Sequence, residues 1–153
     1  MNNPFLLSAS QRLACWKQLR QNIQQADHVD EKIRMALSWW QHAPLENRVI
    51  DWDNHASWPD PWSLLHDNTY CTSAHSLGIA YTLMLADPEQ FSDVRLMLIR
   101  EPDSAIQKIV VYTHDHYLNL GFVDKTPISQ VQNAIRQDTW TWKNKHWQSV
   151  RPK

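Results

Sequence analysis

The sequence predicts an α+β fold in which helices come first and antiparallel strands follow. Three observations predict this class. Apolar residues recur at spacings of three and four in the first 43 residues, as they do in amphipathic helices. The stretch 69–86 leaves little polar face, which is typical of a buried helix. The stretches 94–100, 106–113 and 116–123 are rich in Val, Ile, Leu and Tyr and predict strands.

Residues 1–43 are expected to form an antiparallel helical hairpin. Ser8 or Ser10 can cap the first helix, and Asp27 or Asp30 can cap the second. The second helix should end near residue 43, because the proline that follows disfavours the helical conformation in the residue before it.

The segment 44–68 is expected to be a long ordered loop rich in tryptophan. Trp52, Trp58 and Trp62 lie in it, together with prolines and acidic residues. A loop of this length inside a compact domain is usually functional or packed by its own side chains. We expect the tryptophans to pack it.

Residues 69–136 are expected to form the core, a central buried helix packed on a small antiparallel sheet. The helix is opened by Cys71 and stopped by the Asp-Pro pair at 87–88. The His-Asp pair at 114–115 predicts a tight turn between two of the strands.

Two expectations concern the C-terminal part. The Thr-Pro pair at 126–127 predicts the start of a short helix that runs to about residue 136. The tryptophan-rich tail 137–153 alternates in polarity and predicts a last strand or an extended arm. We expect all 153 residues to form a single domain.

Composition excludes several classes of function. The two glycines, Gly78 and Gly121, lie too far apart for a phosphate-binding loop. A formal net charge of −1 argues against nucleic acid and anionic membranes as partners. The two cysteines lack metal-ligand spacing, so we expect no metal and no cofactor. The N-terminus lacks the basic start and apolar segment of a signal peptide, so secretion by that route is not expected.

Cys71 is the sharpest candidate for chemistry, because the start of a helix lowers the pKa of a thiol. A cysteine that opens a central helix followed by three antiparallel strands resembles the transglutaminase-like branch of the papain-like superfamily. The resemblance covers about residues 58–123 and is carried by WPDPWSLL, YCTSAHSLGIAYTLML and QKIVVYTHDHYLNL.

The resemblance implies a histidine near the start of the second strand and an Asp or Asn near the end of the third. The chain offers Gln107 or Lys108 at the first position and Asn119 at the second. Asparagine can orient an imidazole, but glutamine cannot accept the proton of a thiol. The match therefore implies a kept fold with a degraded catalytic triad.

Other histidines are alternative bases. His75 follows Cys71 by one helical turn. A shift of the hairpin register could bring His114 toward Cys71, which would complete a triad with Asn119. His114 and His116 can also be interpreted as metal ligands, although a solvated turn is the favoured interpretation.

Asp51 and Asp53 can be interpreted as a general acid and base. Carboxylates in a polar, tryptophan-rich loop are more often caps and turn formers, and we favour that interpretation.

The nine tryptophans are more than a core of this size needs. Trp16 and Trp40 fit the apolar stripes of the two predicted helices. The others predict a binding surface, with a protein partner favoured over a sugar and a single-stranded nucleic acid disfavoured by the charge. The candidate binding residues are Trp52, Trp58, Trp62, Trp140, Trp142 and Trp147.

The favoured function is a non-catalytic interaction or assembly protein on a transglutaminase-like scaffold. The W-P-D-P-W stretch before a cysteine-initiated helix also resembles small proteins of tailed bacteriophages. That resemblance implies a virion component or assembly factor, for example at the head–tail connection, found in the host cytoplasm or the virion. The alternative is a cysteine amidohydrolase or peptidase in which Cys71 attacks, a histidine acts as base and Asn119 orients it. An inhibitor or immunity protein with one partner is a third possibility.

Overall fold

In the computed structural model, four α-helices precede a six-stranded sheet within the described residues, which are 3–45, 50–51, 53–100, 107–119, 126–127, 135–143 and 145–150. The helices are η1 (Pro4–Leu6), α1 (Ala9–Gln25), α2 (Val29–Trp40), η2 (His55–Ser57), α3 (Pro61–Asp67) and α4 (Thr72–Ala86), with η marking 3-10 turns. The strands are β1 (Arg95–Arg100), β2 (Gln107–Thr113), β3 (His116–Leu118), β4 (Thr126–Pro127), β5 (Ile135–Lys143) and β6 (His146–Ser149). The predicted α+β class is confirmed.

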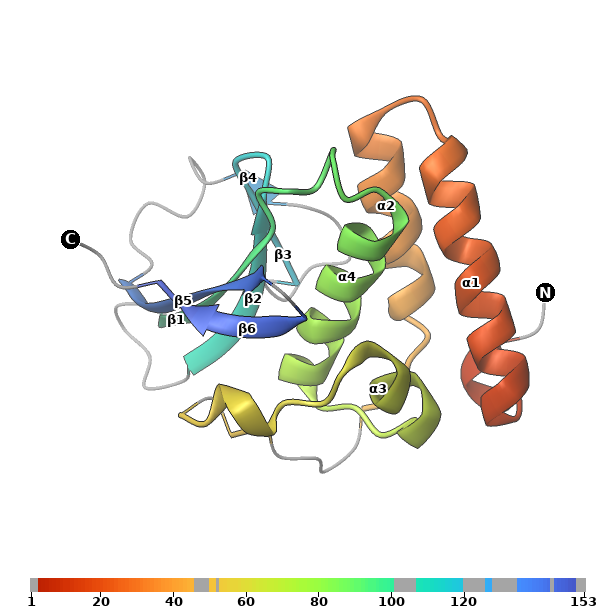
Figure 1. The fold of residues 1–153 in the computed structure, drawn as a ribbon, viewed down its shortest axis with the longest axis horizontal. Coiled ribbons are helices and arrows are strands. Elements are labelled where there is room, and N and C mark those ends of the chain that lie inside the picture. The colour runs from red at the N-terminus through yellow and green to blue at the C-terminus, as the bar shows by residue number, and fades with distance from the viewer. Residues whose placement is uncertain are drawn as a thin grey trace.

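The molecule is built in layers around α4. In Figure 1 the sheet, α4 and the α1–α2 hairpin follow one another from left to right, and α3 lies below. Ten of the fifteen residues of α4 are buried, which fits its place between the sheet and the hairpin. The predicted central buried helix is confirmed. No helix in the described residues is long and apolar enough to cross a membrane.

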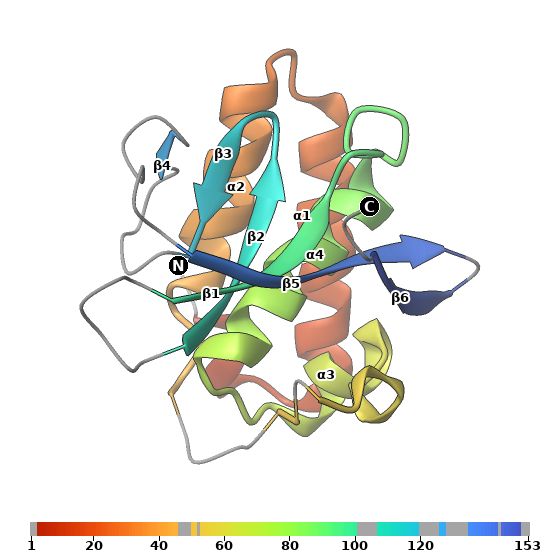
Figure 2. The ribbon, with the colours of Figure 1, turned by 90° about the vertical axis from the view of Figure 1, so that its left-hand side faces the viewer.

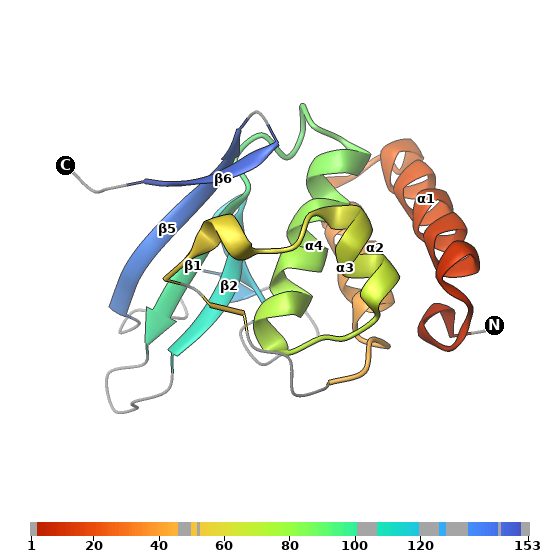
Figure 3. The ribbon, with the colours of Figure 1, turned by 60° about the horizontal axis from the view of Figure 1, so that its bottom comes forward.

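The sheet is antiparallel at every pairing and has the strand order β4-β3-β2-β1-β5-β6. Figure 2 shows β5 lying across β1, and Figure 3 shows the sheet edge-on beside α4. Alternate residues of β2 divide between the two faces. Ile109 and Val111 belong to the core shared with α4, whereas Val110 packs with Met97 and Ile99 on the opposite face.

The contact between α4 and the hairpin depends on one hydroxyl and one glycine. Thr82 Oγ1 accepts hydrogen bonds from Nε1 of Trp16 (2.9 Å) and Nε1 of Trp40 (2.8 Å), and donates to the carbonyl of Gly78 (2.7 Å). The Trp40 ring lies where a Cβ on Gly78 would be. Trp16 and Trp40 are buried, which confirms their predicted place in the core.

The helical hairpin is confirmed, with one change at a cap. Ser8 caps α1 in a reciprocal pair of hydrogen bonds with Gln11. The residue before α2 is His28, which makes no side-chain capping bond, so neither Asp27 nor Asp30 is the cap. A partly buried ion pair instead joins α2 to the end of α4, because Lys32 Nζ lies 2.6 Å from Asp87 Oδ2.

The segment 44–68 differs from the predicted loop, because residues 61–67 form α3. Asp60 caps this helix through Ser63, and Pro61 occupies its first turn. The buried guanidinium of Arg12 donates to three carbonyls, those of Leu7, Leu65 and His66. These bonds hold the end of α3 against α1.

The C-terminal part differs from prediction at residues 126–127 and 135–136, the two ends of the predicted short helix, whereas 128–134 lie outside the described residues. Thr126–Pro127 is the edge strand β4, and residues 135–136 already belong to β5, so both ends of the predicted short helix are extended. Proline fits an edge strand, because it cannot donate the hydrogen bonds that a central strand makes to both neighbours. Of the two alternatives predicted for the tail, the strand is found and the extended arm is not, because β5 pairs with β1 and β6 pairs with β5.

Candidate functional site

Cys71 lies immediately before the first turn of α4, as predicted. Its backbone is extended (φ −94°, ψ 178°) and its carbonyl accepts the first helical bond, from His75. The side chain makes no capping bond and is half-buried against the core. Both cysteines are free thiols.

The start of β2 lies at the same end of the molecule as the start of α4 (Figures 1 and 2). Ser76 Oγ, in the second turn of α4, donates a 2.6 Å hydrogen bond to the carbonyl of Ile109. By strand alternation Gln107 shares the face of Ile109, toward α4, and Lys108 is on the opposite face. Of these two candidates, Gln107 is therefore the one on the side of Cys71.

Asn119 lies beside the first turn of α4. Its backbone is left-handed (φ 68°), a conformation that asparagine tolerates better than most residues. Its Nδ2 donates to the Thr72 carbonyl (3.0 Å) and to Ser76 Oγ (2.8 Å). Both amide hydrogens therefore tie the end of β3 to α4, and neither is directed to a histidine.

The structure does not bring His114 to Cys71. The His114 ring lies 2.8 Å from the Gln90 carbonyl and packs on Phe91, beyond the C-terminal end of α4. The fifteen residues of α4, about 22 Å of helix, separate the two ends. His114 and Asp115 do form the predicted tight turn, with φ of 48° and 60°.

All eight histidines lie in the described part of the chain, and none of them is hydrogen-bonded to the Cys71 thiol. His75 is near in sequence, but its ring packs against Trp40 and Tyr70 and is bonded to the Pro44 carbonyl. Its Nε2 is buried without a partner. Burial lowers the pKa of His75, more than the Pro44 bond raises it, so this imidazole is held neutral.

Two other predicted groups have structural roles. The Asp51 carboxylate accepts a 3.0 Å hydrogen bond from the backbone of Asp53, which is a turn-forming contact. The His116 ring bonds to the carbonyl of His114 (2.6 Å). Within the described ranges, no three His, Cys, Asp or Glu side chains gather as metal ligands would.

A cavity of about 750 Å3 is lined by four of the predicted tryptophans, Trp58, Trp62, Trp142 and Trp147. We call it the tryptophan cavity; Tyr81 and Leu85 of α4, and the charged or titratable side chains His55, Asp60, Lys145 and His146, also line it. Figure 3 shows α3 on one side of α4 and the β5–β6 hairpin on the other. Trp140 is not part of it.

Trp140 is buried (1% exposed) and packs under Trp58, with ring centroids 5.0 Å apart, so its predicted role on a surface is wrong. Trp58 (8% exposed) and Trp147 (5%) are buried as well, so they present only a small part of their rings to the cavity. Trp62 is 51% exposed, as a binding residue should be in the free protein. Trp52 lies outside the described residues.

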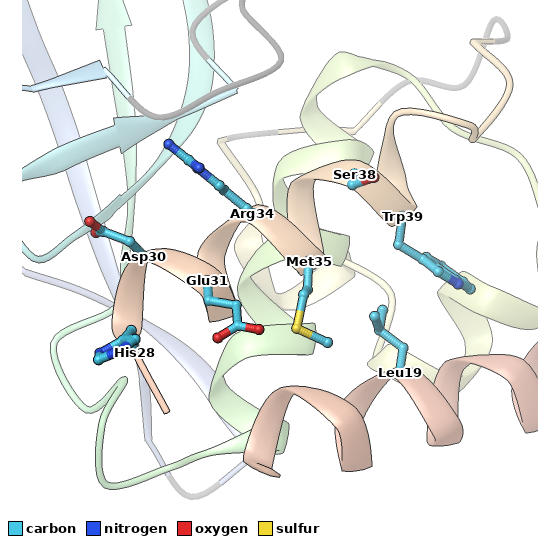
Figure 4. Close-up of a pocket in the computed structure, with 8 residues that line it drawn as sticks. All are labelled: Leu19, His28, Asp30, Glu31, Arg34, Met35, Ser38 and Trp39. Carbon is cyan, nitrogen blue, oxygen red and sulfur yellow. The ribbon is translucent and has the colours of Figure 1, made fainter. Parts of the chain in front are cut away.

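A second, shallower groove of about 670 Å3 runs between α1 and α2. Figure 4 shows Leu19 and Met35 directed into the space between the helices, whereas Arg34 is directed away from it. This groove was not predicted from the sequence. Leu19 fits the apolar stripe of α1, but Met35 and Trp39 lie off the buried stripe of α2.

No family model matches the chain, and no curated protein matches it. Solved structures of LapG from Legionella pneumophila do match. One LapG structure has a TM-score of 0.66 at 12% identity, covering 87% of this chain and 74% of LapG. The calcium-bound LapG structure has a TM-score of 0.65 at 13% identity, covering 88% of this chain and 84% of LapG. The fold of this chain is therefore transglutaminase-like.

Proposed function

We propose that this chain is a non-catalytic interaction protein on a transglutaminase-like scaffold. One observation carries the proposal. At the start of β2, on the face toward α4, the chain has Gln107, whereas the resemblance implies a histidine there. A glutamine amide can donate and accept hydrogen bonds, but it does not take up a proton near neutral pH.

The chemistry of an unassisted thiol supports this function. A cysteine with an ordinary pKa of about 8.5 is only a few per cent thiolate at pH 7. A base would have to bond to the thiol, and no histidine does. The two amide hydrogens of Asn119 already bond to α4, so this residue acts as an anchor for β3.

The partner that we propose is a protein, and the surface is the tryptophan cavity. Trp62 supplies an exposed aromatic ring of the kind that binding partners cover. The resemblance of the W-P-D-P-W stretch to tailed-phage proteins is the ground for a finer proposal, an assembly role in the virion or the host cytoplasm.

The first test is the rate at which iodoacetamide modifies Cys71 between pH 5 and 9 in a Cys15→Ser variant. We expect the rate to rise with pH across the whole range without reaching a plateau, because no histidine bonds to the thiol. Cys71→Ser in the same background gives the blank. A plateau with an apparent pKa well below 8 would overturn the non-catalytic function.

A second test restores the missing base. Gln107→His should lower the apparent pKa of Cys71 in the alkylation profile, because an imidazole would then stand on the face toward α4. Lys108→His is the matched control, since it adds the same group on the opposite face of β2. An equal effect of both variants would contradict the placement of Gln107.

The second candidate function is a cysteine amidohydrolase or peptidase. The position of Cys71 before α4, with a side chain that makes no cap, favours it. This function requires that Cys71→Ala abolish the hydrolysis of peptide or isopeptide substrates and leave the unfolding free energy nearly unchanged. The non-catalytic function requires that the unsubstituted chain show no such hydrolysis.

A further inference from the structure

The tryptophan cavity has two rigid aromatic walls. On one side Trp62 packs edge-on against Trp16, with ring centroids 5.3 Å apart, and the Arg20 guanidinium lies 4.3 Å from the Trp16 ring and 5.3 Å from the Trp62 ring. On the other side Trp142 packs edge-on against both Tyr81 and Trp147, each at 5.2 Å. These contacts hold the rings in place before a ligand arrives, which reduces the entropy lost on binding.

The polar groups deeper in the cavity are already bonded within the chain. Trp147 Nε1 donates to the hydroxyl of Tyr81 (2.9 Å), and that hydroxyl donates to the carbonyl of Pro59 (2.7 Å). Trp58 Nε1 donates to the carbonyl of Asp51 (2.8 Å). Burial raises the pKa of Tyr81, so its hydroxyl stays protonated and keeps this chain of bonds.

Two hydrogen-bond donors on the aromatic walls are left for a ligand. In the described part of the chain, the indole N–H groups of Trp62 and Trp142 have no acceptor, and Lys145 has no ion-pair partner. The acceptors in the lining are the imidazoles and the carboxylate of Asp60, one oxygen of which already caps α3. A ligand that these two indoles bind directly carries acceptors next to apolar rings.

This pattern separates the ligand classes that aromatic sites take. Lys145 and the Asp60 carboxylate both line the cavity, so its charge does not favour the cations that aromatic rings would otherwise attract. A sugar presents hydroxyl groups that donate as well as accept, whereas the indole N–H groups on the two aromatic walls can only donate. A proline-rich segment fits both requirements, because proline has no N–H, its carbonyls are free in the polyproline II conformation, and its ring packs on aromatic faces.

We propose that the tryptophan cavity binds a proline-rich segment of a protein partner in the polyproline II conformation. Proline rings stack on Trp62 and Trp142, and the indole N–H groups of these residues donate to carbonyls of the segment. The proposal rests on the proposed function in that the partner is a protein, and it names the class of segment that this partner presents.

The test is a titration of the 15N-labelled chain with decaproline, followed through the indole N–H signals of the nine tryptophans. Trp62→Phe and Trp142→Phe each remove one signal and so assign it. We expect the signals of Trp62 and Trp142 to shift on titration. The signals of Trp16 and Trp40, which are bonded to Thr82, should stay in place.

The variants measure what each indole contributes. Loss of one indole N–H in Trp62→Phe or Trp142→Phe should weaken decaproline binding about threefold to tenfold. Trp62→Ala should weaken it more than tenfold, and its remaining indole signals report whether it is folded. Trp39→Phe, in the groove between α1 and α2, is the matched control and should bind as the unsubstituted chain does.

Three results overturn the proposal. The first is a spectrum that millimolar decaproline leaves unchanged. The second is a shift that a Gly-Ser decapeptide reproduces. The third is a shift of the Trp62 and Trp142 signals with maltohexaose or dT10 in place of decaproline. The thiol experiment is independent of all three. A reactive Cys71 overturns the non-catalytic function without affecting the cavity, and a failed titration leaves that function standing.

Discussion

Ring carbons of Trp40 occupy the place that a Cβ on Gly78 would take, so the indole rests directly on the backbone of α4. Gly78→Ala should lower the free energy of unfolding by about 1–3 kcal/mol, measured by urea denaturation, because the ring has to move. On an open helix face the same change would raise it by up to about 1 kcal/mol. The sign of the effect therefore tests the contact. Trp40→Phe should relieve the clash, so the double variant should lose less than the sum of the single variants.

The hydroxyl of Thr82 is the shared acceptor of two indole groups, from Trp16 and Trp40. Thr82→Val keeps the shape of the side chain and removes this acceptor, which leaves two buried N–H groups unbonded. We expect a loss of about 2–4 kcal/mol in the free energy of unfolding. Thr82→Ser keeps the hydroxyl and should lose only about 1 kcal/mol, for the missing methyl group. Equal losses in the two variants would contradict the role of the hydroxyl.

Stability should fall as pH is lowered from 7 to 5 because of His75. Burial lowers its pKa below the usual 6.5, so the unfolded chain takes up the proton first and unfolding is favoured in acid. The slope contributed by one proton is at most about 1.4 kcal/mol per pH unit. His75→Gln should reduce the slope, whereas His66→Gln, at a side chain that is 69% exposed, should leave it unchanged. If the pH dependence of the unfolding free energy is unchanged in His75→Gln, it comes from another titratable group.

A second loss of stability is expected at lower pH, from the pair Lys32 and Asp87. The hydrogen bond from Lys32 lowers the pKa of Asp87 below its usual 3.8, so the pair stabilises the fold above that pH and the contribution is lost as pH falls below it. Asp87→Asn should cost about 1.5–3 kcal/mol at pH 7 and flatten the profile below pH 4. Glu89→Gln, which alters an exposed neighbouring carboxylate, is the control. If the stability of Asp87→Asn depends on pH below 4 as that of the unsubstituted chain does, the Lys32–Asp87 pair is not the cause of the acid loss.

Local sequence signals were enough for the longer helices, α1, α2 and α4. Ser8 and the apolar spacing after it predict α1, and the apolar stretch after Cys71 predicts α4. The signal for α3 was also present, in Asp60 and Pro61, but the density of proline and aspartate around it favoured a loop. His28 precedes α2 without a capping bond, and sequence alone cannot show that the pair of Lys32 with Asp87 ties that helix in place.

The parts of the site that sequence could not predict depend on pairing between distant strands. The register of β2 decides that Gln107 faces α4, and the length of α4 decides that His114 is far from Cys71. The tryptophan cavity needs residues near 60 and near 145 to meet across α4. A surplus of tryptophan indicated binding, but it could not separate the buried Trp140 from the exposed Trp62.

The place of β5 in the sheet has a consequence for how the chain is made. β1 is an interior strand, and one of its two neighbours, β5, is the second-to-last strand in the sequence. While the ribosome still holds residues 135–149, one edge of β1 is unpaired, and Trp58 and Tyr81 lack their aromatic partners Trp140 and Trp147. An unpaired strand edge next to exposed aromatic rings can pair wrongly with another nascent copy of the chain. The yield of native protein should therefore depend on how fast the ribosome releases the chain, or on a chaperone that binds the β1 edge until then.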